Sequence, residues 1–81
     1  MKTSFSMLKE VVSLLKEIRF TQCKAGDCVC RCLDQVIQTL EDVRVKDYSE
    51  PEVAAIILNE LGYLFSEFPE IQKEFTRLAE L

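Results

Sequence analysis

The sequence predicts an all-α fold: a compact antiparallel bundle of four helices, three of them long and the C-terminal one short. Apolar residues recur at spacings of three and four along most of the chain. Each of the two prolines stands where a helix would begin, and two glycines leave few turns for a sandwich or barrel. With 81 residues, 48% of them hydrophobic, residues 1–81 are expected to form a single helical domain.

The first helix is expected between Phe5 and Phe20. Its polar residues, such as Lys9 and Lys16, fall on the side opposite to its apolar residues. The apolar residues are Phe5, Leu8, Val11, Val12, Leu15 and Ile18. Residues 21–27 lose this rhythm and contain the first glycine, so we expect them to form a loop.

The second helix is expected from about Cys28 to Val45, with Asp27 as its N-cap. Its apolar residues follow the helical period and are Val29, Cys32, Leu33, Val36, Ile37, Leu40 and Val43. Four alternating residues at its end, 43–46, are interpreted as the last turn of this helix, not as a strand.

The third helix begins at the clearest local signal in the chain. Ser49 and Glu52 match a capping box, Pro51 suits the first turn, and Tyr48 with Val53 can form a hydrophobic staple. We therefore expect a helix from this point to about Glu67.

The apolar arc of this third helix is much wider than those of the first two, with Leu61 near its middle. Its residues are Val53, Ala54, Ile56, Ile57, Leu58, Leu61, Leu64 and Phe65. A central helix contacted on several sides has such an arc, and so has a helix with a dimer surface. Ala55, Asn59 and Gly62 form a narrow strip of small residues that would let another helix approach closely.

The fourth helix is expected to begin at Pro69, because proline disfavours helical geometry at the residue before it. Ile71, Phe75 and Leu78 continue at helical spacing to the end of the chain. The short junction predicts that this helix folds back or turns sharply on the third.

The charge distribution bears on the partners that the protein can have. Residues 1–31 hold six basic and three acidic residues, a net charge of +3, while residues 32–81 hold four basic and eleven acidic ones, a net charge of −7. This acidic excess argues against a nucleic-acid partner. With neither a secretory signal nor a membrane-spanning run of about 20 apolar residues, we expect a cytoplasmic location, reduced thiols and no membrane partner.

The four cysteines, Cys23, Cys28, Cys30 and Cys32, lie within ten residues and are the only chemical cluster in the sequence. Four thiolates suit Zn or an Fe–S cluster, but the C-x4-C-x-C-x-C spacing is typical of neither. In a regular helix Cys30 lies about 160° away from Cys32, so one ion could not bind both. A redox switch through Cys23 is a second interpretation. The simplest is that Cys32 is a small core residue and Cys30 borders it.

The sequence predicts a small acidic, non-enzymatic interaction or regulatory module without a cofactor. Histidine is absent and no glycine-rich phosphate loop is present, so the usual catalytic arrangements are missing. The partner is expected to be another protein or a second copy in a homodimer, bound through a surface that includes Ile56 and Tyr63. The alternative is a Zn, Fe–S or redox module that uses the four cysteines.

Overall fold

The computed structural model describes residues 4–22 and 28–80, and within these ranges every regular element is a helix. The helices are α1 (Ser4–Gln22), α2 (Cys28–Val45), α3 (Glu50–Glu67) and α4 (Pro69–Ala79). This confirms the predicted all-α bundle of three long helices and one short one. The cap assigned to Asp27 lies outside the described residues.

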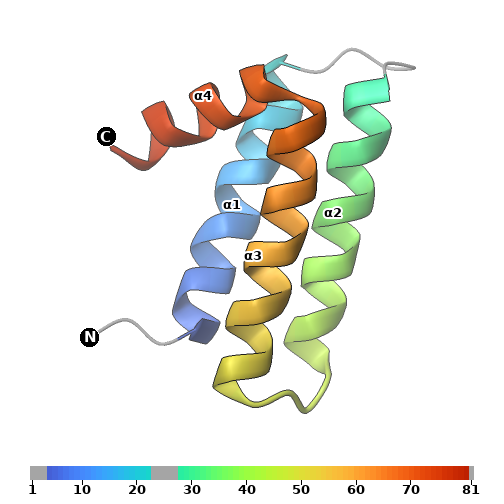
Figure 1. The fold of residues 1–81 in the computed structure, drawn as a ribbon, viewed down its shortest axis with the longest axis vertical. Coiled ribbons are helices and arrows are strands. Elements are labelled where there is room, and N and C mark those ends of the chain that lie inside the picture. The colour runs from blue at the N-terminus through green and yellow to red at the C-terminus, as the bar shows by residue number, and fades with distance from the viewer. Residues whose placement is uncertain (1–3, 23–27, 81) are drawn as a thin grey trace.

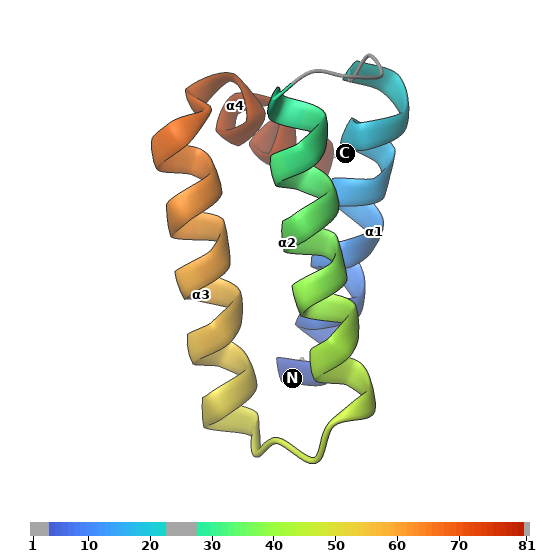
Figure 2. The ribbon, with the colours of Figure 1, turned by 90° about the vertical axis from the view of Figure 1, so that its right-hand side faces the viewer.

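The three long helices lie side by side, with α2 antiparallel to both α1 and α3 (Figure 1). Helix α4 turns across the end of the bundle, where it packs against α1 and α3 (Figures 1 and 2). Because α4 does not contact α2, the side of α3 that borders α2 is left uncovered by it.

The core lies between the four helices and follows the predicted stripes closely in α1 and α2. Each buried side chain comes from a position that repeats at helical spacing. The core residues are Leu8, Val11, Val12, Leu15, Ile18, Leu33, Val36, Ile37, Leu40, Val43, Val53, Ile57, Leu64 and Ile71. Phe65 and Phe75 join α3 to α4 with ring centroids 5.4 Å apart and tilted planes.

The start of α3 differs from the predicted capping box. Ser49 is the N-cap and Pro51 lies in the first turn, but the Ser49 hydroxyl donates to Oε1 of Glu52 at 2.9 Å and does not cap a backbone amide. The first turn is instead held by the Val53 amide, which donates to the Ser49 carbonyl at 3.0 Å. A bond between the serine and glutamate side chains is thus found where the capping box predicted bonds to backbone amides.

The junction between α3 and α4 is the single residue Phe68. Its backbone is not helical, with φ −134° and ψ 82°, since steric clash with Pro69 disfavours helical geometry there. The Phe68 amide donates to the Leu64 carbonyl at 2.9 Å, and the Phe68 carbonyl accepts from the Ile71 amide at 3.0 Å. One non-helical residue between two helices produces the sharp turn that places α4 across the bundle.

Three core assignments from the sequence are wrong or only partly right. Leu58, placed in the apolar arc of the third helix, is 71% exposed. Leu61 is half-buried against the core, whereas Ile57 and Leu64 are fully buried. Cys30, not Cys32, is the buried thiol of α2, with 3% of its surface exposed. In each case the helix is correct, and its rotation relative to the neighbouring helices differs from the expectation.

Candidate protein interaction face

Helix α3 presents an exposed and uncharged face between its two acidic ends. The side chains repeat at spacings of three, four and seven, which places them on one side of the helix. We call this surface the α3 face, and it comprises Ala55, Leu58, Asn59, Gly62, Tyr63 and Ser66, all exposed. Large apolar side chains with this exposure are the usual mark of a binding surface when they gather on one face.

Two large side chains flank a strip of small ones on this face. Leu58 and Tyr63 are 71% and 58% exposed, and their positions are five apart in the sequence, which places them about 140° apart around the helix. Ala55, Gly62 and Ser66 lie between these two directions. The α3 face is therefore a strip with an apolar side chain on either side.

Gly62 is not explained by packing within the chain. A Cβ atom built on it meets nothing within 4 Å. A glycine inside a helix destabilises that helix by about 1 kcal/mol relative to alanine. Since no neighbouring group would collide with a side chain at position 62, packing within the chain gives no reason for glycine there.

The charged residues of α3 itself are all acidic. Helix α3 contains Glu50, Glu52, Glu60 and Glu67 and no lysine or arginine. Glu60 and Glu67 also act on a group of the neighbouring helix. The pKa of the Cys32 thiol on α2 is raised above its ordinary value, mainly by burial and then by the charges of Glu67 and Glu60. Glu60 and Glu67 thus lie near enough to α2 to act on the Cys32 thiol.

The structure places the two predicted surface residues on this same side of α3. Tyr63 is exposed, as an interaction surface requires. Ile56 is half-buried, packs against the core and lines a depression of about 250 Å³ between α2 and α3. The other residues of the depression are Thr39, Asp42, Val43, Lys46, Tyr48 and Glu60. Ile56 therefore contributes less exposed surface than predicted.

Leu58 is the surface residue that the sequence reasoning missed. The available signal was its position, three residues after Ala55 and four before Gly62, which puts it beside the strip of small residues. Because Leu58 is apolar, the sequence pattern predicts that it belongs to the core.

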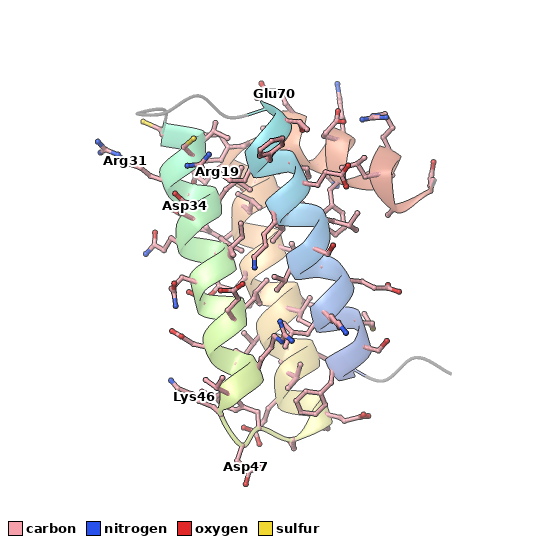
Figure 3. All side chains as sticks on the ribbon, turned by 180° about the vertical axis from the view of Figure 1, so that it is seen from behind. Arg19, Arg31, Asp34, Lys46, Asp47 and Glu70 are labelled. Carbon is pink, nitrogen blue, oxygen red and sulfur yellow. The ribbon has the colours of Figure 1, made fainter. Side chains whose placement is uncertain are left out.

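The α1–α2 side of the bundle has a different character. Lys16 pairs with Glu41, and Arg19 Nε lies 3.0 Å from Asp34 Oδ1. Figure 3 shows Arg19 and Asp34 directed toward each other from their two helices. Among the residues that the structure describes, no ion pair joins α2 to α3 in the same way. On the α3 side of α2, Asp42 instead accepts a hydrogen bond from Gln38 Nε2 of the same helix at 3.1 Å.

A second and larger depression of about 660 Å³ lies between α1 and α4. Its lining alternates polar with apolar side chains, and consists of Ser6, Lys9, Glu10, Ser13, Leu14, Leu78 and Ala79. This mixture gives it neither a continuous apolar surface nor a single sign of charge.

The cysteines that the structure describes do not converge. Cys28 is exposed, Cys30 is buried and Cys32 is half-buried, all on the regular helix α2, while Cys23 lies outside the described residues. Within residues 4–22 and 28–80, no three side chains of Cys, Asp or Glu are grouped as a metal site would need. The helical geometry at Cys28–Cys32 is the reason, because Cys30 and Cys32 lie about 160° apart.

Comparisons of the chain with family models, with curated proteins and with solved structures give no match. In the ranges that the structure covers, no helix combines the length and the apolar character needed to cross a bilayer. The function must therefore be argued from the surface itself.

Proposed function

We propose that this protein is a non-enzymatic protein–protein interaction module that binds a helix on its α3 face. The observation that carries the proposal is Gly62, a helix-interior glycine with open space at its Cβ position, in the middle of an exposed and uncharged surface. A glycine at this position allows a helix of a partner to pack closely against α3.

Helix packing explains the composition of the face. Small residues let two helix axes approach to the short end of the usual range of about 8–10 Å. Leu58 and Tyr63 would then enclose the incoming helix from both sides and lose their exposure to water. Tyrosine is among the residues that most often dominate binding energy in interfaces, so Tyr63 is the expected main contributor.

The experiment introduces a photo-crosslinking amino acid at position 58, on the face, and at position 45, where Val45 is 84% exposed on α2. We expect a partner protein to crosslink at position 58 and not at position 45. This crosslink should disappear when Gly62→Leu places a large side chain among the small residues. Circular dichroism checks that Gly62→Leu keeps the helical fold. Equal crosslinking from the two positions, or crosslinking insensitive to Gly62→Leu, would contradict the proposal.

Self-association is tested separately, because a second copy is one of the proposed partners. Sedimentation at micromolar and submicromolar concentrations measures the oligomeric state of the wild type and of Tyr63→Glu. A dimer that Tyr63→Glu dissociates supports the homodimer. A monomer at every concentration, unchanged by Tyr63→Glu, removes the homodimer and leaves a different protein as the partner.

A further inference from the structure

We infer that the partner at the α3 face is a basic amphipathic helix from another protein and not a second copy of this chain. The inference rests on the proposed function, since it specifies the partner of that same surface. It comes from the charges that surround the face.

The acidic residues form a border around the uncharged α3 face. Glu52 precedes the face along the helix, Glu67 follows it, and Glu60 lies on the side toward α2. Glu52 and Glu67 are exposed and Glu60 is half-buried. Lys46, in the α2–α3 depression, is the one base among that depression's lining residues. A helix that lies on the α3 face meets negative charge at both ends and along one edge.

A second copy does not match this border. In an antiparallel pair that places Leu58 against Tyr63 of the second copy, Glu52 comes close to Glu67 of the second copy, and symmetry repeats this contact at the other end. In a parallel pair each glutamate meets its own counterpart. Both arrangements bring like charges together, which disfavours the homodimer at neutral pH.

The border also specifies the pattern of the partner. Glu60 and Glu67 are seven residues apart, two helical turns on one side of α3. A complementary helix carries small and apolar residues along its centre and lysine or arginine residues seven apart along one edge. Such pairs at the rim of an interface raise the association rate and define the register of the helices.

The probe is a synthetic helical peptide of about five turns with alanine and leucine along one side and lysines at seven-residue spacing along one edge. A first control peptide has glutamate in place of each lysine. A second keeps the composition but moves the lysines to the opposite side of the helix. Binding to the full chain is measured by fluorescence anisotropy at low and at moderate salt.

The expected result is binding of the edge-lysine peptide alone, weakened by salt. Glu60→Gln/Glu67→Gln is expected to reduce its affinity by about two- to tenfold, because each exposed ion pair that is lost contributes only modestly. The matched control, Glu17→Gln/Glu80→Gln, changes the net charge equally at exposed positions outside α3 and is expected to change the affinity less than about twofold.

Each other outcome has a separate meaning. If the control variant weakens binding as much as the Glu60/Glu67 variant, or if the edge-lysine peptide does not bind, the basic partner is wrong. The glutamate peptide could bind as tightly as the edge-lysine peptide, with Tyr63→Glu abolishing the binding of both. In that case the α3 face binds helices, but its acidic border does not select them, and the basic partner is wrong. A wild-type homodimer at neutral pH and low salt would also overturn the inference. Binding that Tyr63→Glu leaves unchanged contradicts the proposed function itself.

Discussion

Cys30 and Cys32 lie two residues apart on α2 but face different helices. Cys30 is buried on the side toward α1, since Asp34, one turn further along, pairs with Arg19 of α1. Cys32 packs against the core on the opposite side, where it is close enough to Glu60 and Glu67 of α3 for their charges to raise its pKa. The Cys30 thiol therefore lies at the boundary between α2 and α1, and the Cys32 thiol lies at the boundary between α2 and α3.

The Cys32 thiol is expected to react slowly with iodoacetamide at neutral pH. Its raised pKa lowers the fraction of thiolate, which is the reactive form. The rate should rise with pH around a midpoint above the ordinary thiol value, and Glu67→Gln should move that midpoint downward without restoring it fully, because burial remains the larger cause. Mass spectrometry of the peptide that carries Cys32 follows the reaction. A midpoint unaffected by both Glu67→Gln and Glu60→Gln would show that these charges do not act on the thiol.

Leu64→Ala is expected to destabilise the fold by about 2–5 kcal/mol, because Leu64 is fully buried. Leu61→Ala should cost clearly less, about 1–2 kcal/mol, since Leu61 is only half-buried. Urea unfolding of the two matched variants measures the difference. A larger loss for Leu61→Ala than for Leu64→Ala would place Leu61 at the centre of the core, as the sequence alone had suggested.

Gly62→Ala is expected to stabilise the monomer by about 0.5–1 kcal/mol, because alanine restricts the unfolded chain and its Cβ meets nothing in the folded state. Ala55→Gly on the same exposed face is the matched reverse change and should lower the free energy of unfolding by a similar amount. Thermal and urea unfolding test both. Destabilisation by Gly62→Ala would indicate a close neighbour that the open space at its Cβ position does not suggest.

Ser49→Ala is expected to cost no more than about 0.5 kcal/mol, less than the loss of an ordinary N-cap, because the exposed hydroxyl bonds a side chain and not the helix backbone. Urea unfolding provides the measurement, with Glu52→Gln as the comparison. A loss above about 1 kcal/mol would mean that the hydroxyl caps the helix in solution.

The Arg19–Asp34 pair is expected to contribute little stability. Its side chains are 36% and 59% exposed, and such pairs are worth about 0.2–1 kcal/mol. A double-mutant cycle with Arg19→Gln and Asp34→Asn gives the coupling, which should shrink as salt is added. Coupling that persists in high salt would contradict this account.

Most boundaries of the helices could be predicted from the sequence because the signals that set them are local, but α1 continues to Gln22, two residues past its expected end at Phe20. The expected range Cys28–Val45 is the range observed for α2, and α3 ends at Glu67, two residues before Pro69. Proline geometry and apolar spacing act within a few residues, so no knowledge of the fold is needed. The strip of Ala55, Asn59 and Gly62 was recognised for the same reason.

Local signals could not decide which part of a wide apolar arc becomes buried. Ile57 and Leu58 are adjacent and similarly apolar, yet one is buried and the other is 71% exposed. The single non-helical residue Phe68 turns α4 across α1 and α3. The positions of these helices and of α2 determine which directions around α3 are filled. The amino-acid sequence by itself determined the helices and their apolar stripes. Only the tertiary structure decided their rotations, and with them the exposure of the α3 face, because burial depends on neighbours that are distant along the chain.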